Sequence, residues 1–209
     1  MLTINKINYN RNRQQIIYNL GFSTGLGSCL VLKGKNGSGK TTLLKIIAGL
    51  NEIESKDDNN QLLWNNNLIS EIKEDFYNDV NYIGHENSLK LDLSIFDNLL
   101  FYTRINKTEL LIPSAIRYFE LDNLIDVEVR KLSAGIRKKV ALCLLLCCPS
   151  TIWLLDEPTI NLDSKAKQKL FNLVSTRIKE NGIVIIASHD DLFDNIAAKV
   201  NLDDFKKSI

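Results

Sequence analysis

The segment GKNGSGKTT at residues 34–42 restricts the fold of this chain more than any other feature. It matches G-x-x-x-x-G-K-[ST], follows a predicted buried strand at 29–33 and opens a predicted amphipathic helix at 40–50. A Gly-rich turn carrying Lys-Thr by chance is the alternative, and the strand and helix argue against it. Because backbone N–H groups and a helix N-terminus bind phosphates, we predict a nucleotide-binding loop formed by Gly34, Lys35, Asn36, Gly37, Ser38, Gly39, Lys40, Thr41 and Thr42.

Two carboxylates follow a second apolar strand, in TIWLLDEP at residues 151–158. In a phosphate-loop protein, Lys40 reaches the β- and γ-phosphates, and Thr41 and Asp156 hold Mg²⁺. The next residue, Glu157, is suited to activate a water molecule for in-line attack. A solvated Asp-Glu turn is the alternative, which the phosphate loop makes less attractive. We therefore predict Mg²⁺ beside the phosphates of a bound nucleotide; the family resemblance given below implies that this nucleotide is ATP.

Short strands alternate with helices along the 209 residues. This order favours an α/β domain with a largely parallel sheet. Residues 94–148 are expected to be mostly helical, so we predict one domain with a core (1–86 and 150–209) and an inserted helical lobe (87–149). Strands are predicted at 2–7, 29–33, 80–84, 151–155 and 183–187, helices at 40–50, 164–179 and 190–198, and a polar surface loop at 54–60.

Charge and apolar patterning narrow the classes of partner. The formal net charge of +1 gives no reason to expect nucleic acid. The start of the chain lacks the apolar stretch of a signal peptide, and the longest apolar run, 140–148, is too short to cross a bilayer. Four cysteines without framework spacing suggest a reducing compartment. We expect a protein that is soluble, or peripheral through a partner.

The segment KLSAGIRKKVALCLLL at 131–146 lies between these motifs. Its LSAG followed by a basic helix resembles the signature of ATP-binding-cassette (ABC) ATPases. The triplet at 161–163 (NLD) and the segment at 187–190 (ASHD) resemble further motifs of that family, in the family's order. The resemblance covers essentially the whole chain. It implies a P-loop NTPase fold of the ABC nucleotide-binding type, with a RecA-like core and an inserted helical lobe.

The resemblance also assigns roles to residues of the signature and the switch motif. Ser133 and Gly135 lie at a predicted helix N-terminus, where a hydroxyl and N–H groups are offered to an anion. In this family the anion is the γ-phosphate bound by the opposite subunit, which implies a homodimer. His189 is expected to contact the γ-phosphate and sense hydrolysis; the alternative is a packed core histidine.

His85 and Glu86 stand where most ABC ATPases carry a glutamine. The block YIGH followed by SLKLDLSIFDNLLFY resembles one branch of the family, the ATP-binding subunits of haem-exporter or cytochrome c-maturation complexes. His85 then occupies the position that couples core and lobe and counts among the catalytic candidates. Whether His85 or Glu86 acts there, or His85 only caps the turn, the sequence leaves open.

Three other features of the sequence leave a functional role open. Ile136 replaces the glutamine usual at the fifth signature position. Adenine could stack on Tyr9 or on an arginine of the 11–15 stretch. Cys148-Pro149 could ligate haem iron, although a cysteine in an apolar run more often packs as a small hydrophobe.

The resemblance implies the ATP-hydrolysing subunit of a membrane ABC complex that exports or delivers haem in cytochrome c-type biogenesis. Hydrolysis would drive a conformational change in a separate integral membrane permease. The chain would be peripheral, at the cytoplasmic face of the inner membrane or on the matrix side of an organelle. The alternatives are a subunit of another ABC transporter, a soluble ABC ATPase such as one of iron–sulfur assembly, or a module that binds ATP without turnover.

Overall fold

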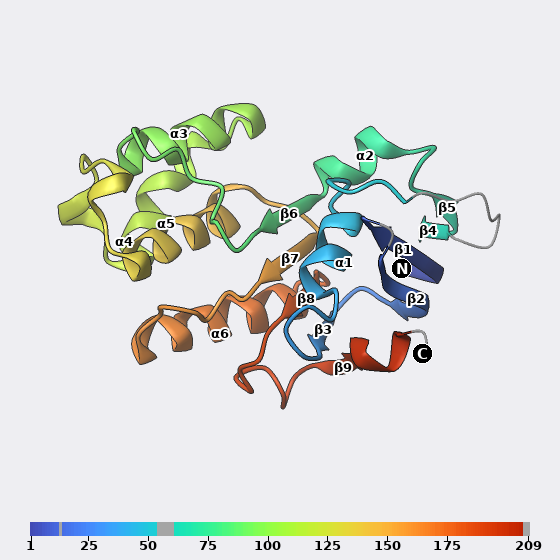
Figure 1. Cartoon of the computed structure of the whole chain (residues 1–209). Coiled ribbons are helices and arrows are strands. Elements are labelled where there is room, and N and C mark those ends of the chain that lie inside the picture. The colour runs from blue at the N-terminus through green and yellow to red at the C-terminus, as the bar shows by residue number, and fades with distance from the viewer. Residues whose placement is uncertain (13, 54–60, 207–209) are drawn as a thin grey trace.

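The computed structural model describes residues 1–12, 14–53 and 61–206, which form two sheets and the helices that cover them (Figure 1). The larger sheet is parallel, with strand order β6-β7-β8-β3-β9. Its strands are β3 (Ser28–Lys33), β6 (Val80–Ile83), β7 (Ile152–Asp156), β8 (Ile183–Ala187) and β9 (Ala198–Asn201). The smaller sheet is antiparallel in the order β2-β1-β4-β5, with β1 (Leu2–Arg11), β2 (Gln14–Thr24), β4 (Gln61–Trp64) and β5 (Asn67–Leu68).

The central strands of the parallel sheet are buried on both faces, as their continuous apolar sequences require. On β7, Leu154 points into the core shared with α1 (Lys40–Ile47) and the antiparallel sheet. Its neighbours Trp153 and Leu155 point to the opposite face. That face carries α5 (Ala134–Cys147) and α6 (Ser164–Lys179). Successive strand residues therefore feed two separate cores, one on each side of the sheet.

Three helices form the part of the molecule farthest from the antiparallel sheet (Figure 1). They are α3 (Ile95–Asn106), α4 (Ile112–Phe119) and α5, and no strand occurs between 94 and 148, all of which the structure describes. Ser94 caps α3 by accepting the N–H of Asp97. These helices pack against each other and, through α5, against β6.

Polar contacts tie α4 to α6. The Tyr118 hydroxyl donates to the carbonyl of Lys169, at 2.9 Å. At the end of α4, Glu120 has a left-handed backbone and accepts from Lys165 and Lys169, at 2.8 Å each. We call Tyr118, Glu120, Lys165 and Lys169 the α4–α6 clamp. It joins the helical part of the chain to the helix that follows β7.

Most predicted elements match the structure, and one is wrong. The helix at 164–179 and the strand at 183–187 are confirmed, whereas the predicted helix at 190–198 does not form. There, Ser188 Oγ accepts the N–H of Asp190, and Asp190 Oδ1 accepts the N–H of Leu192. These side-chain oxygens take N–H groups that a helix would need.

Other differences concern the N-terminal part. The first helix ends at Ile47, two residues before Gly49, whose φ of 71° ends it. Strands β2, β4 and β5 were not predicted. For β2, bulges in its pairing with β1 interrupt the alternating pattern. The loop predicted at 54–60 lies outside the described residues. The short helix α2 (Lys73–Asn78), which precedes β6, was also not predicted.

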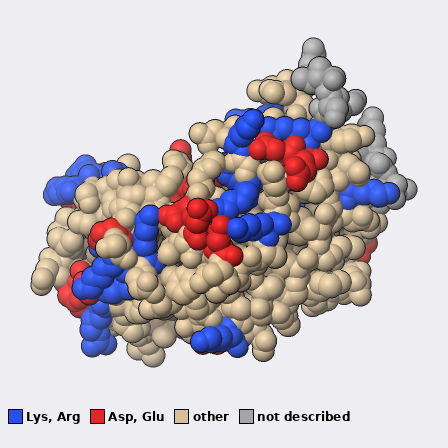
Figure 2. Space-filling view, turned by 90° about the horizontal axis from the view of Figure 1, so that it is seen from below, with Lys and Arg blue, Asp and Glu red and all other residues tan. Residues whose placement is uncertain are grey.

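Within the described part of the chain, no helix combines the length and apolar character needed to cross a membrane. On the face seen from below in Figure 2, lysines and arginines lie beside aspartates and glutamates. Charged side chains of both signs are thus interspersed on that face.

Candidate nucleotide-binding site

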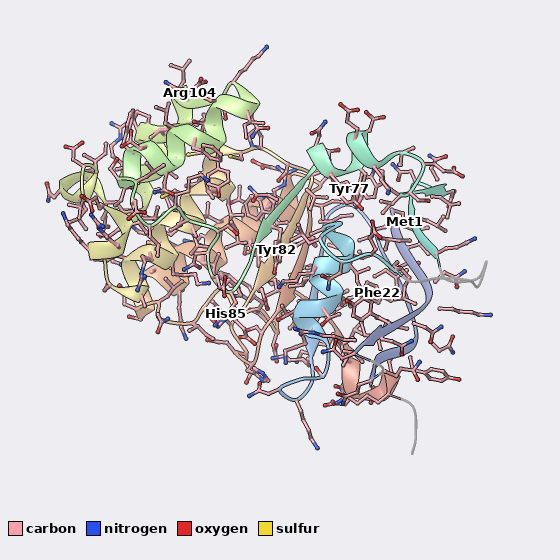
Figure 3. The ribbon with its side chains drawn as sticks, turned by 45° about the horizontal axis from the view of Figure 1, so that its top comes forward. Met1, Phe22, Tyr77, Tyr82, His85 and Arg104 are labelled. Atoms are coloured by element: carbon pink, nitrogen blue, oxygen red, sulfur yellow. The ribbon has the colours of Figure 1, made fainter. Side chains whose placement is uncertain are left out.

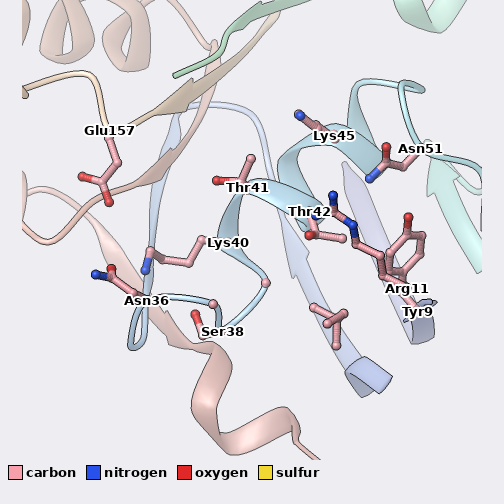
Figure 4. Close-up of a pocket in the computed structure, with 13 residues that line it drawn as sticks. Tyr9, Arg11, Asn36, Ser38, Lys40, Thr41, Thr42, Lys45, Asn51 and Glu157 are labelled. Atoms are coloured by element: carbon pink, nitrogen blue, oxygen red, sulfur yellow. The ribbon is translucent and has the colours of Figure 1, made fainter. Parts of the chain in front are cut away.

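The phosphate loop connects the end of β3 to the start of α1. Gly34, Gly37 and Gly39 have φ values of 137°, 77° and 104°, a backbone region that side chains disfavour. A Cβ on Gly34 would also lie 2.7 Å from Ser38 Oγ. No side chain caps α1, so its first N–H groups have no side-chain acceptor in the described structure. The loop and helix start border a cavity of about 480 Å³ (Figure 4).

Lys40 is folded back onto the loop that surrounds it. Its ammonium donates to the carbonyls of Gly34 at 2.7 Å and Lys35 at 3.3 Å. It also lies 3.1 Å from Nε2 of His189, and that nitrogen is 3.0 Å from Asn36 Oδ1. The predicted lysine and histidine, 149 positions apart, therefore meet at the phosphate loop.

Thr41 and Asp156 form an incompletely satisfied pair. The Thr41 hydroxyl donates to Asp156 Oδ1 at 3.1 Å. Asp156 is only 1% exposed, and its other oxygen, Oδ2, has no hydrogen-bond partner among the described residues. A buried carboxylate oxygen without a donor is costly unless it meets a cation. A hydroxyl beside a free carboxylate oxygen is the donor set that Mg²⁺ prefers, so the residues present fit this metal.

Glu157 borders the same cavity as the phosphate loop (Figure 4). Its φ of 47° is unusual for a residue other than glycine, and its N–H donates to the carbonyl of Ala187 at 2.8 Å. One carboxylate oxygen is 3.7 Å from Nε2 of His189. Strained backbone of this kind concentrates at functional sites. Here it turns the carboxylate out of the end of β7 and toward the phosphate loop.

The signature lies away from this cavity and packs against a loop of its own chain. Ser133 caps α5 by accepting the N–H of Ile136 at 3.3 Å. Gly135 has no room for a side chain, because a Cβ would lie 2.5 Å from the carbonyl oxygen of Asn161. Lys139 also pairs with Asp163 at 2.7 Å. Neither Ser133 nor Gly135 lines the phosphate-loop cavity.

His85 lies in a neighbouring cavity rather than at the phosphate loop. It follows β6 directly (Figure 3) and is exposed. The cavity, about 440 Å³, is bordered by His85, Glu86, Asn87, Leu89, Leu91, Ala134, Arg137, Lys138, Ile160 and Asn161. The structure thus brings His85 together with the start of the signature helix. Its catalytic or coupling role stays a prediction.

Two further observations concern residues that the sequence left ambiguous or missed. Tyr9 and Arg11 both line the phosphate-loop cavity, on the side of β1 (Figure 4), whereas Arg13, the other arginine of the 11–15 stretch, lies outside the described residues. Which side chain contacts adenine stays a prediction. Lys138 is almost completely buried next to His85's cavity. Its only sequence signal was a lysine on a helix otherwise rich in apolar residues.

The thiol of Cys148 is half-buried at the end of α5. Burial raises its pKa, which a hydrogen bond with Asn106 partly opposes. Among the described residues, no group of three or more His, Cys, Asp or Glu side chains is placed to hold a metal ion.

A parallel sheet with a glycine-rich phosphate loop after β3 and paired acids at the end of β7 defines a phosphate-loop nucleotide-binding protein. Residues 17–160 match the family described as ABC transporter, and the chain belongs to this family.

Curated relatives and solved structures agree with that family. The chain is 35% identical to the "Cytochrome c biogenesis ATP-binding export protein CcmA" of Rickettsia bellii, covering 91% of this chain and 94% of the relative. The protein of that name from Aliivibrio fischeri is also 35% identical, with 92% and 94% covered. A structure titled as the ATP binding subunit of an ABC transporter gives a TM-score of 0.82 at 22% identity over 96% of this chain and 85% of that one. A dimeric ATP-binding cassette bound to ADP and Pi gives 0.79 at 20% over 96% and 94%. The predicted fold is confirmed.

Proposed function

We propose that this chain is the ATP-hydrolysing subunit of a membrane ABC complex that serves cytochrome c-type biogenesis. Relatives that share about a third of its residues over nine tenths of its length are named as ATP-binding export proteins of that process. The observation that carries the ATPase activity is one cavity bordered by Lys40, Thr41 and Glu157, beside the free oxygen of Asp156. Haem export or delivery is the specific task that follows from this branch of the family.

ATP binding requires Lys40 to exchange partners. Its ammonium now satisfies two loop carbonyls, and the β- and γ-phosphate oxygens offer the same lysine charged acceptors, which form stronger hydrogen bonds. The N–H groups at the start of α1, which no side chain caps, supply further donors. Tyr9 and Arg11 line the far side of the cavity, which supports the proposal that one of them holds the adenine ring.

Hydrolysis is assigned to the carboxylates and His189. Thr41 and Asp156 would hold Mg²⁺, which when bound neutralises charge that develops on the phosphate oxygens. Glu157 accepts a proton from the attacking water. His189, 3.7 Å from Glu157 and 3.1 Å from Lys40, is placed to donate a hydrogen bond to the γ-phosphate.

The site needs a second copy of the chain to be complete. Ser133 and Gly135 do not line the cavity of their own phosphate loop, so an ATP bound there leaves them free to face the ATP of a partner subunit. The dimeric solved cassette of the same fold supports this arrangement. We infer a homodimer with two ATP molecules between its subunits.

We assign the coupling of ATP hydrolysis to transport to the helical lobe, residues 87–149. The core of the domain then consists of residues 1–86 and 150–209. The helices α3, α4 and α5 lie together at one end of the molecule (Figure 1), and His85 lies where the core chain enters them. In this proposal the permease is a separate integral membrane protein of a haem-handling complex. The chain would then be peripheral, at the cytoplasmic face of the inner membrane or the matrix side of an organelle.

An affinity pull-down tests the specific task. The tagged chain is captured from detergent-solubilised native membranes, partners are identified by mass spectrometry, and absorbance is scanned for haem. Multi-span proteins together with a haem-binding partner are expected. A soluble iron–sulfur scaffold, or a permease unconnected with haem, would contradict the cytochrome c role while leaving the ATPase activity in place.

A further inference from the structure

One ring nitrogen of His189 has two close neighbours that make opposite demands on it. Nε2 lies 3.1 Å from the ammonium of Lys40 and 3.0 Å from Oδ1 of Asn36. An ammonium can only donate hydrogen bonds, and an amide oxygen can only accept them. In a neutral imidazole one nitrogen carries the proton and the other accepts. The position of the ring proton therefore decides which of the two contacts is a hydrogen bond.

The surroundings of Lys40 favour a hydrogen bond from its ammonium to His189. Lys40 is 7% exposed, and its three N–H groups have acceptors in the carbonyl of Gly34 at 2.7 Å, the carbonyl of Lys35 at 3.3 Å and Nε2. A buried donor without an acceptor is costly, and hydrogen bonds from charged donors are stronger than neutral ones. While Lys40 is folded onto the loop, Nε2 therefore accepts, and the ring proton belongs on Nδ1.

ATP reverses the demand on the same nitrogen. In the proposed function, the ammonium of Lys40 turns to the β- and γ-phosphates and leaves Nε2. Two acceptors remain beside this atom, Asn36 Oδ1 at 3.0 Å and Glu157 Oε1 at 3.7 Å. An oxygen of the γ-phosphate is a further acceptor. Nε2 then needs a proton, which a neutral imidazole supplies by carrying it on Nε2 instead of Nδ1.

Solvent can carry out this exchange. The side chain of His189 is 53% exposed, so water can take the proton from Nδ1 and return one to Nε2. The number of bound protons and the charge of the ring stay the same. Charged side chains of both signs border the open side of the ring, those of Lys33, Lys35, Lys199, Asp203 and Asp204.

We propose that ATP binding moves the ring proton of His189 from Nδ1 to Nε2, and that Asn36 is the positioning residue that stabilises the second tautomer. This inference rests on the proposed ATPase function. With Lys40 on the loop, Nε2 has no proton to offer to a phosphate. Once Lys40 has turned away, Asn36 Oδ1 favours the donating tautomer, and the γ-phosphate then shares its proton. His189 thus becomes a phosphate donor only after Lys40 has engaged the nucleotide.

Nitrogen-15 NMR of the histidine rings tests this order. The chain has two histidines, His85 and His189, so the spectrum of His85→Gln assigns the signals. At pH 8 without nucleotide, His189 should be mainly protonated on Nδ1, and with Mg²⁺ and the non-hydrolysable analogue AMP-PNP mainly on Nε2. The tautomer ratio should change about tenfold or more, as expected for one hydrogen bond to a charged group. An unchanged ratio, or a ring protonated on both nitrogens, would overturn the proposal.

Variants of the two neighbours test their roles without any nucleotide. Lys40→Met removes the ammonium and keeps the chain length, so His189 should already carry its proton on Nε2. Lys45→Met, an exposed lysine on the same helix, is the matched control and should keep the proton on Nδ1. Adding Asn36→Leu to Lys40→Met should lower the ratio of Nε2–H to Nδ1–H by about fivefold, the effect of one neutral hydrogen bond.

The outcomes separate the two proposals. A Lys40→Met protein that keeps the proton on Nδ1 would overturn the tautomer change, and an unchanged ratio in the double variant would remove Asn36 from its positioning role. Backbone amide spectra verify that each variant is folded, and Lys40→Ala replaces the methionine variant if that does not fold. A wild-type protein whose amide signals do not respond to AMP-PNP would instead contradict the proposed function.

Discussion

Thr41 and Asp156, 115 positions apart, are joined by a 3.1 Å hydrogen bond, and Asp156 keeps its second oxygen without a donor. The relationship arises because α1 begins next to the end of β3 and β7 ends two strands away in the same sheet. Ligands of open α/β sheets bind outside the carboxyl ends of their strands. We propose that a cation binds at this free carboxylate oxygen.

Asp156→Asn should remove Mg²⁺-dependent hydrolysis and stabilise the nucleotide-free protein. Loss of the charged ligand is expected to lower kcat on the order of a hundredfold or more. Removing an unpaired buried charge should raise the free energy of unfolding without nucleotide by about 1–3 kcal/mol. The two effects are measured by phosphate release and by denaturant unfolding. Unchanged turnover at the same Mg²⁺ concentration would contradict the assignment of Asp156 as a metal ligand.

Glu157→Gln should retain ATP binding but lower hydrolysis by about 10²–10⁴-fold, the usual contribution of a general base. In the proposed homodimer, hydrolysis of ATP lets the two subunits separate. The variant cannot hydrolyse ATP, so it should elute as a dimer with ATP and Mg²⁺ in size-exclusion chromatography. The wild-type protein under the same conditions is the control. Normal turnover in the variant would remove Glu157 from the role of base.

Gly135→Ala should disturb the contact between the signature and the loop at 161–163. The added Cβ would lie 2.5 Å from the carbonyl oxygen of Asn161, so the loop must move or the protein loses about 1–3 kcal/mol of stability. Tm and hydrolysis are both expected to fall. Gly25→Ala is the matched control, because a Cβ there meets nothing within 4 Å. Equal behaviour of the two variants would show that the close approach has no consequence.

His85→Ala should lower hydrolysis stimulated by the membrane partner more than basal hydrolysis. The residue lies outside the phosphate-loop cavity, beside the start of the signature helix, so its loss leaves ATP contacts intact. Turnover is measured for the isolated chain and for the reconstituted complex. Glu86→Ala in the same assays compares the two candidates. Equal losses of basal and stimulated activity for His85→Ala would argue against a coupling role.

The α4–α6 clamp predicts a pH-dependent contribution to stability. Hydrogen bonds from Lys165 and then Lys169 lower the pKa of Glu120 to about 2, from 4.5. A carboxyl with a lowered folded-state pKa stabilises the protein above pH 4.5, and this contribution is lost as the pH falls from 4.5 toward 2. Glu120→Gln should therefore lower Tm slightly at pH 7, with a difference from wild type that shrinks below pH 4.5. A Tm difference that is constant between pH 7 and pH 3 would show that charge is not its cause.

The adenine contact and the His85 environment show where sequence reasoning stopped. The sequence offered Tyr9 or an arginine of the 11–15 stretch for the adenine contact, and the structure shows that Tyr9 and Arg11 line the same cavity. From its place in the sequence, His85 was predicted to couple the core to the helical lobe, but the sequence did not show which residues surround it. Its cavity is shared with Ala134 and Asn161, residues that come from two other segments of the chain.

The sequence by itself was enough to predict the phosphate loop, the buried strands that precede this loop and the Asp156-Glu157 pair, and the family. These features depend on local motif spacing and on strand and helix periodicity. It misjudged 190–198, where the side chains of Ser188 and Asp190 take backbone N–H groups. The tertiary structure alone decided which distant groups meet: Lys40 meets His189, and Gly135 meets Asn161. The physical reason is that burial and long-range charge depend on how the helices pack on the sheet, which no local pattern records.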